Sequence, residues 1–197
     1  MSDIASASFK PAFSPLKLNS RSHGIQLVAV TLGTLFLALS SYIEVPMVPV
    51  PITMQTFAVT LVGALYGWRL GGITITAWLV EGAFGLPVLA GGAAGAHHFV
   101  GATGGYLFAF PVVGMLVGWL AERGWNGNRV LRAFAVMLMG NALCLTIGAA
   151  WLAVLIGAEQ AIVHGVLPFI VGAILKSALG AATLRAVAPS AKRVDQV

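Results

Sequence analysis

Long apolar stretches, separated by short polar or glycine-rich segments, dominate the chain after its first 23 residues. A membrane-spanning helix needs about 20 mostly apolar residues, and six stretches meet or approach that length. We therefore predict spans over 24–43, 52–67, 70–85, 104–123, about 130–156 and about 162–187. Residues 1–23 and 188–197 are polar, and we expect them to be cytoplasmic tails, the first of them mobile, on either side of one membrane domain, 24–187.

The second and third predicted spans are short and are separated by Gly67, Trp68 and Arg69. This sequence, followed by Gly71 and Gly72, is typical of a tight turn at a membrane interface. A single merged span would place Arg69 within lipid, which is energetically costly. The pattern therefore favours two spans that are joined by a turn.

The basic residues test this layout through the positive-inside rule, by which Lys and Arg concentrate in cytoplasmic loops. The predicted outer loops contain Glu44, Glu159, His97 and His98, and neither Lys nor Arg. Ten of the eleven basic residues fall on the opposite side: Lys10, Lys17, Arg21, Arg69, Arg123, Arg129, Arg132, Arg185, Lys192 and Arg193. We therefore predict that both termini are cytoplasmic.

The composition agrees with a membrane protein. The chain is 58% hydrophobic and only 9% charged, whereas a soluble domain carries about 25% charged residues. Its net charge of +5 then reflects the basic residues that orient the protein in the membrane, and it does not indicate nucleic-acid binding. Cys144 is the only cysteine, which excludes an intrachain disulfide. The predicted fold class is an all-α integral membrane protein with six transmembrane helices.

The eleventh basic residue, Lys176, lies near the middle of the last predicted span. A lysine at the bilayer centre costs roughly 2.5–3.5 kcal/mol on insertion scales. Such a residue should face the bundle interior or a cavity and meet an anion there. The alternative is a lysine whose stem reaches the interface, which the length of span on either side disfavours. We therefore predict that Lys176 binds an anionic solute, such as a carboxylate.

Two segments at the outer end are predicted to cap a ligand cavity. Residues 85–105 contain seven glycines among apolar residues, which indicates a re-entrant loop rather than a helix. Its free backbone groups, including those of Gly91 and Gly92, are candidate ligand contacts. Residues 44–53 contain three prolines, which favour a stiff, extended lid. A plain connector is the alternative for this second segment.

Other polar or small residues in the predicted spans leave two interpretations open. Glu81 is either an interfacial carboxylate or a ligand contact. Gln55 and Asn141 form either helix–helix hydrogen bonds or ligand contacts. Small residues spaced four apart in the first span permit close packing, either within the chain or against another membrane subunit: Ala29, Gly33, Thr34 and Ala38.

Motifs of catalytic or metal sites are missing from the sequence. Lys176-Ser177 follows a leucine, so it is not the end of a phosphate-binding loop. His97 and His98 have no third ligand at a suitable spacing for a metal. Only Glu81 and Lys176 offer an acid–base pair within the bundle. We therefore expect a protein that is not an enzyme and has neither a metal nor a cofactor.

Five blocks follow one another in order through the chain: VPVPITMQT (48–56), GAFGLPVLAGGAAG (82–95), GATGGYLFAFPVVGMLVGWLAERGW (101–125), GNALCLTIGAAWL (140–152) and LPFIVGAILKSAL (167–179). In this order and spacing they resemble the BioY family, the biotin-binding S components of energy-coupling-factor (ECF) vitamin transporters. The resemblance extends from about residue 24 to residue 187, which is nearly all of the chain except its tails.

The resemblance implies that biotin binds from the outside, beneath residues 44–53 and 85–103, with Lys176 holding its carboxylate. It also implies which residues border the pocket: Thr103, Gly104, Gly105 and Tyr106. The implied partners in the cytoplasmic membrane are a transmembrane coupling subunit, docked partly on the small residues of the first span, and two ABC ATPases. A homo-oligomer is also compatible with the resemblance. Because some family members have no dedicated ATPase module, a self-sufficient carrier for biotin or a related small carboxylate is the alternative.

Two positions depart from the family pattern. Ala173 stands where many members have Asp in G-D-x-x-K, and Ala93 stands where many have Arg in G-G-R-x-G. We favour Lys176 acting with uncharged groups, such as Asn141, Gln55 and the loop amides. Replacement of the missing acid by Glu81, or a relative of biotin as ligand, are the alternatives.

Overall fold

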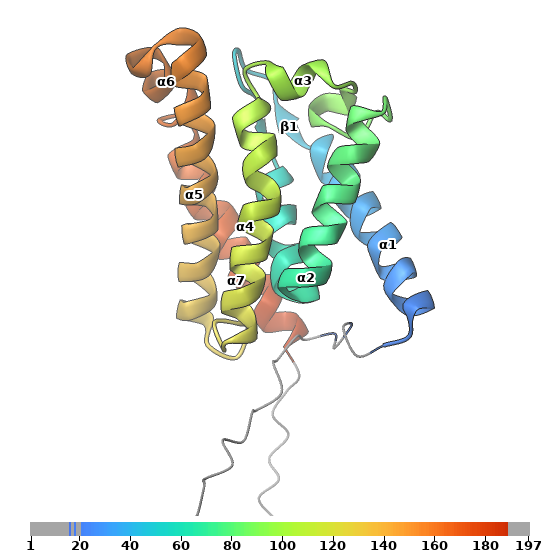
Figure 1. Cartoon of the computed structure of the whole chain (residues 1–197). Helices are drawn as coiled ribbons and strands as arrows, with labels where there is room; N and C mark the ends of the chain where they lie inside the picture. The colour runs from blue at the N-terminus through green and yellow to red at the C-terminus, as the bar shows by residue number, and fades with distance from the viewer. Residues whose placement is uncertain (1–15, 17, 19–20, 189–197) are drawn as a thin grey trace, which may run out of the picture.

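The computed structural model describes residues 16, 18 and 21–188, so most of both predicted tails lies outside the described residues. Within the described part, five helices are long and apolar enough to cross a membrane. They are α1 (His23–Ser41), α2 (Gln55–Ala83), α4 (Gly104–Glu122), α5 (Val130–Ile156) and α7 (Phe169–Val187). They form a bundle in which the start of α1 and the end of α7 lie at the same end (Figure 1).

Short elements lie at the other end of the bundle, above the long helices in Figure 1. They are β1 (Glu44–Val45), β2 (Ile52–Thr53), the 3-10 helix η2 (Ala90–Gly92), α3 (His97–Val100) and α6 (Ala158–Gly165). The two strands pair antiparallel, with Glu44 opposite Thr53. The segment predicted as an extended lid is therefore a small hairpin, and the glycine-rich segment 85–105 contains two short helical turns that the sequence did not predict.

The chain reverses direction within α2, at Gly67. Gly67 has φ 81° and ψ 172°, a backbone conformation that is essentially restricted to glycine. The two halves of α2 pack against each other, because a Cβ atom at Gly71 would lie 3.0 Å from the Cα of Gly63. The reversal lies where the sequence pattern predicts a turn, and the two halves of α2 therefore run side by side in opposite directions (Figure 1).

Glycines also bring α4 close to both halves of α2. A Cβ at Gly118 would lie 2.6 Å from the backbone nitrogen of Trp68 and 2.7 Å from the carbonyl oxygen of Gly63. No side chain fits in so small a space. The turn of α2 therefore rests directly on the last turns of α4, where the backbone N–H of Trp68 donates to Glu122 Oε1 (3.3 Å).

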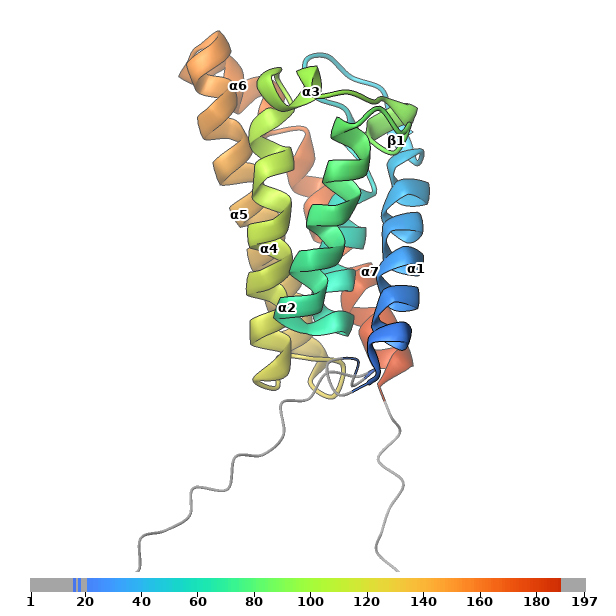
Figure 2. The same cartoon turned by 45° about the vertical axis from the view of Figure 1, so that its right-hand side comes forward.

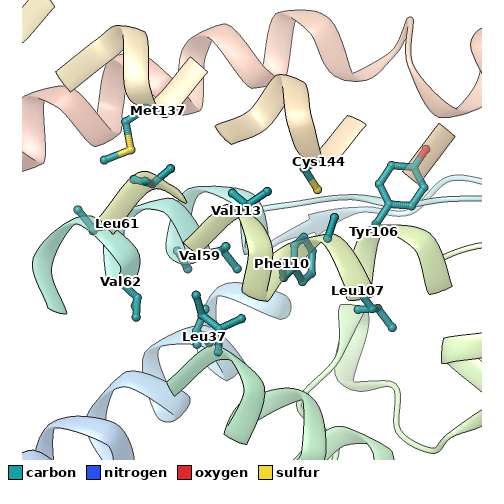
Figure 3. Close-up of a cluster of buried hydrophobic side chains, with 14 of the residues drawn as sticks. Leu37, Val59, Leu61, Val62, Tyr106, Leu107, Phe110, Val113, Met137 and Cys144 are labelled. Atoms are coloured by element: carbon teal, nitrogen blue, oxygen red, sulfur yellow. The ribbon is translucent and has the colours of Figure 1, made fainter. Parts of the chain in front are cut away.

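The core lies between the inner faces of the helices. Leu37, Val59, Val113 and Met137 come from four different helices and are at most 1% exposed. Figure 3 shows these side chains in the buried hydrophobic cluster. The outer faces of the same helices expose large apolar side chains, which fits a surface in contact with lipid: Leu27, Leu32, Val154, Val171 and Leu175.

The predicted start of the last span is wrong. The sequence pattern placed it near Ile162, but α6 ends at Gly165 and α7 begins only at Phe169. Pro168 immediately precedes α7; it cannot donate a helical hydrogen bond and it disfavours helical backbone in the residue before it. The apolar sequence is continuous here, so hydropathy alone did not reveal the break.

Candidate ligand-binding site

Lys176 projects from α7 into the interior of the bundle. Its Nζ donates to the backbone oxygen of Thr53 (2.7 Å) and to Thr56 Oγ1 (3.2 Å). Both acceptors are neutral oxygens at the junction of β2 and α2. An ammonium group has three hydrogens to donate, so one remains for a ligand. The prediction that Lys176 faces a cavity is confirmed.

An inner cavity lies beside this ammonium group. Its walls combine aromatic rings with a few polar side chains: Tyr106, Phe110, Phe169, Gln55, Thr56, Asn141 and Lys176. Of the described residues that line it, Lys176 alone carries a formal charge, and none is Asp or Glu. Apolar walls with a few convergent polar groups are typical of small-molecule sites.

An outer cavity adjoins the inner one, because Val50, Pro51 and Gln55 line both. Residues of the glycine-rich segment, including Ala93, His98 and Thr103, form its other walls. Burial lowers the pKa of His98, and the neighbouring His97 lowers it further. His98 is therefore neutral at neutral pH, which leaves Lys176 as the charged group of the combined site among the described residues.

Asn141 connects α5 with α7 at the inner cavity. Its Nδ2 donates to the carbonyl oxygen of Met137 (3.0 Å) and to Ser177 Oγ (3.2 Å). Ser177 in turn donates to the carbonyl oxygen of Ala173 (2.6 Å). Both bonds of Asn141 use its amide nitrogen, so its Oδ1 atom accepts none within the described residues. Asn141 thus forms a helix–helix bond and retains an acceptor for a ligand.

Gln55 also forms hydrogen bonds within the protein. Its Nε2 donates to Ser41 Oγ (3.1 Å), and its Oε1 accepts from Thr53 Oγ1 (3.0 Å). These bonds connect the start of α2 to the end of α1 and to β2. Because both ends of the amide are engaged, Gln55 shapes the two cavities and holds Thr53 in place beside Lys176.

Tyr106 forms an aromatic wall of the inner cavity. Its hydroxyl donates to the carbonyl oxygen of Gly165 (2.8 Å), and its ring stacks on Phe169 at 6.3 Å between centroids. Gly104 and Gly105 line neither cavity; they allow the start of α4 to pack against Phe99 and Trp151. These two glycines therefore position Tyr106 and Thr103 rather than bordering the cavities themselves.

Three other predicted site residues line neither cavity. Glu81 is half-buried at the end of α2 and lines neither. Gly91 and Gly92 pack closely on residues that follow α1. A Cβ atom at Gly91 would lie 2.6 Å from a carboxylate oxygen of Glu44, and one at Gly92 would lie 2.9 Å from the ring of Tyr42. Together with the bond from the Tyr42 hydroxyl to the Pro87 carbonyl oxygen (2.6 Å), these contacts join the two outer loops.

The small residues of α1 face the interior of the chain. Ala29, Gly33, Thr34 and Ala38 are all buried. The Tyr66 hydroxyl donates to the backbone oxygen of Ala29 (2.9 Å), and a Cβ at Gly33 would also meet Tyr66. Of the two interpretations, internal packing is the one that this conformation shows. Docking of another subunit on this face stays a prediction.

Sequence reasoning missed several residues of the site. Thr56 accepts a hydrogen bond from Lys176, and Phe110 and Phe169 form walls of the inner cavity. The polar residues Thr53, Gln55 and Thr56 cluster at the start of an apolar span, which is a signal that could have identified Thr56. The two phenylalanines gave no signal, since they stand among many other apolar residues.

Comparisons with known proteins give one consistent result. The model of the BioY family matches residues 14–193. The chain is 41% identical over 152 residues to the "Probable biotin transporter BioY" of Pyrococcus horikoshii, covering 76% of this chain and 89% of that protein. It is 33% identical over 180 residues to "Biotin transporter BioY2" of Lactococcus lactis subsp. cremoris, covering 88% and 97%.

The fold also matches a solved structure. The crystal structure of the S-component for biotin from an ECF-type ABC transporter superposes with a TM-score of 0.74 at 27% sequence identity. The match covers 85% of this chain and 94% of that one. The resemblance found in the five sequence blocks is thus confirmed over most of the chain, which belongs to the BioY family.

Proposed function

We propose that this chain is the biotin-binding subunit of an ECF-type vitamin uptake transporter. Relatives named as biotin transporters and the similar fold of a biotin S-component support this proposal. The observation that carries it is the ammonium group of Lys176, the one charged group among the described residues of the combined cavity. A buried charge needs a partner, and the carboxylate of biotin supplies one.

In the proposed complex, the carboxylate accepts the remaining hydrogen of Lys176 Nζ, while Thr53 and Thr56 hold the other two. The rest of the ligand extends from the inner cavity toward the outer one, past Val50, Pro51 and Gln55, which line both. Ala173 lies in the wall of the inner cavity, close to Lys176. Since it brings no acid there, the ammonium group is not neutralised by this neighbour, which strengthens its attraction for an anionic ligand.

We extend the proposal to the topology and the partners. The two halves of α2 are separate spans, which gives six, and the Gly67 turn and both termini are cytoplasmic. Biotin enters from the outside, beneath the loops joined by Tyr42 and Pro87. A coupling subunit and ABC ATPases supply the energy for uptake across the cytoplasmic membrane, in agreement with the absence of a phosphate-binding loop in the sequence.

Calorimetric titration of the detergent-purified protein with biotin tests the role of Lys176. We expect tight binding to the wild type and binding about 10–100-fold weaker to Lys176→Met, because a charge-assisted hydrogen bond contributes roughly 1.5–3 kcal/mol. Thr183→Val is the matched control, since Thr183 lies on the same helix and bonds only to Leu179. Biotin amide, which lacks the carboxylate charge, should bind weakly to every variant.

The outcomes separate the parts of the proposal. If Lys176→Met binds biotin as tightly as Thr183→Val does, the lysine is not part of the site. If the amide binds the wild type as tightly as biotin does, Lys176 contacts another oxygen of the ligand. If the wild type does not bind biotin, the presence of Ala173 and Ala93 in place of the family's Asp and Arg has changed the ligand.

The alternative of a self-sufficient carrier is tested in liposomes that contain this chain alone. We expect bound biotin but no net uptake, even with an ion gradient across the membrane. Sustained accumulation of biotin in the lumen would favour the alternative and would remove the need for the ATPase partners.

A further inference from the structure

Of the three tryptophan–arginine pairs that the described residues form at the end of the bundle at which α2 turns, two lie in α2 and at the end of α4. The guanidinium carbon of Arg69 lies 4.9 Å from the ring centroid of Trp68, and that of Arg123 lies 3.4 Å from the ring centroid of Trp119. Both rings are partly exposed, at 38% and 41%. Tryptophan is enriched where a membrane meets water, and arginine near that level attracts anionic lipid headgroups.

The two pairs belong to one surface. The turn of α2 rests on the end of α4, since Trp68 N–H donates to Glu122 Oε1 and a Cβ at Gly118 would touch Trp68. Arg69 and Arg123 directly follow the two bonded residues in the sequence, so they come from adjoining segments. The carboxylate of Glu122 already accepts a backbone hydrogen bond, which reduces its repulsion of an anion at this surface.

A groove begins at this surface. Trp68 and Arg69 form its mouth, and Gly72, Ile73, Thr76 and Met115 line it between the second half of α2 and α4. Ile73 is 58% exposed and Met115 is 36% exposed, so the groove opens outward. From Arg69 to Thr76 it extends about 10 Å along the helix, at about 1.5 Å per residue. It shares no lining residue with the two cavities of the biotin site.

We propose that this groove binds an anionic glycerophospholipid, with the headgroup phosphate at Arg69 and one acyl chain along Ile73, Thr76 and Met115. The cationic mouth complements a phosphate, and the apolar lining complements a hydrocarbon chain. The groove runs along the helices from the membrane surface toward the bilayer centre, which is the direction of an acyl chain. The orientation proposed above places this lipid in the cytoplasmic leaflet, but its binding does not depend on biotin.

Native mass spectrometry of the delipidated protein, titrated with phosphatidylglycerol or phosphatidylcholine, tests the proposal. We expect Arg69→Gln to bind phosphatidylglycerol about fivefold more weakly, as estimated for the loss of one cationic contact at a membrane surface. Thr76→Phe, which fills the groove, should weaken binding of both lipids. Arg185→Gln is the matched control, because it removes a cation at the same end of the bundle outside the groove. Biotin binding should be unchanged in all three variants.

Four results would overturn the proposal. Equal losses in Arg69→Gln and Arg185→Gln would indicate diffuse attraction rather than a site. Equal binding of the two lipids by the wild type would remove the role of the headgroup charge. Displacement of the lipid by millimolar inorganic phosphate would point to a free-anion site. If Arg69→Gln and Thr76→Phe bind lipid normally but lose a coupling subunit, the groove is a protein-docking surface.

Discussion

Asn141 combines two roles at the residue scale, and substitutions can separate them. Asn141→Ala and Ser177→Ala both remove the bond between α5 and α7, so each should lower the free energy of unfolding by about 1–3 kcal/mol. Only Asn141→Ala also removes the Oδ1 acceptor at the inner cavity. We therefore expect Asn141→Ala to weaken biotin binding more than Ser177→Ala does, when thermal unfolding and calorimetric titration are measured on both variants.

Thr146→Ala is the control for this comparison, because Thr146 lies exposed on α5 and bonds only to Ala142 of the same helix. It should leave both the unfolding temperature and biotin binding near the wild-type values. Equal losses of biotin affinity in Asn141→Ala and Ser177→Ala would show that Asn141 acts only through the packing of α7.

Single residues could be predicted from the sequence where their chemistry conflicts with an apolar environment. Lys176 is such a residue, since an unpaired charge in a membrane span is costly, and the structure places it at a cavity. The sequence could not predict whether the small residues of α1 face the interior of the chain or the lipid. A membrane helix is apolar on its lipid face and on its protein face alike, so no period in its sequence separates Gly33 from its exposed neighbour Leu32.

At the scale of elements, Gly67 determines the path of α2. Its φ of 81° and ψ of 172° are strained for any residue with a Cβ, at a cost of about 1–3 kcal/mol. Gly67→Ala should therefore lower the unfolding temperature of the purified protein and weaken biotin binding, because Gln55 and Thr56 begin the same element. Thermal unfolding with and without biotin measures both effects.

Gly24→Ala is the matched control for Gly67→Ala. Gly24 lies in the first turn of α1, and a Cβ there would meet nothing within 4 Å. Alanine at this position should be neutral or slightly stabilising, since it favours helix. If the two variants unfold at the same temperature, the turn at Gly67 is not strained by a side chain and the path of α2 has another cause.

The elements differ in how far the sequence could predict them. The turn at Gly67 was predictable, because Arg69 cannot remain in lipid without cost. The gap between α6 and α7 was not, since residues 158–187 read as one apolar run apart from a few polar positions. Tertiary contacts accompany that gap: the Tyr106 hydroxyl holds the carbonyl oxygen of Gly165, and the Tyr106 ring stacks on Phe169 at the start of α7.

Charge separates the two ends of the whole molecule. Arg69 and Arg123 lie beside the last turn of α4, and Arg185 lies in the last turn of α7. These helix ends and the start of α1 are at one end of the bundle, whereas β1 with Glu44 and α6 with Glu159 are at the other end (Figure 2). The lid loops and the outer cavity are at the end with Glu44 and Glu159, whereas Glu122 lies at the end with the arginines. In the proposed function, a carboxylate ligand enters at the end with the lid loops and is attracted by Lys176, which lies deeper in the bundle at the inner cavity.

Cysteine labelling tests this arrangement, because Cys144 is the only native cysteine and Cys144→Ala provides a background without thiols. Val48 and Leu86 are exposed residues on either side of α2, 90% and 51% accessible. In the proposed topology, Val48→Cys and Leu86→Cys both react with a membrane-impermeant maleimide on intact cells. Asn128→Cys, in the exposed connection between α4 and α5, should react only after permeabilisation. If α2 crossed the membrane once, Val48→Cys and Leu86→Cys would lie on opposite faces, and only one of them would be labelled on intact cells.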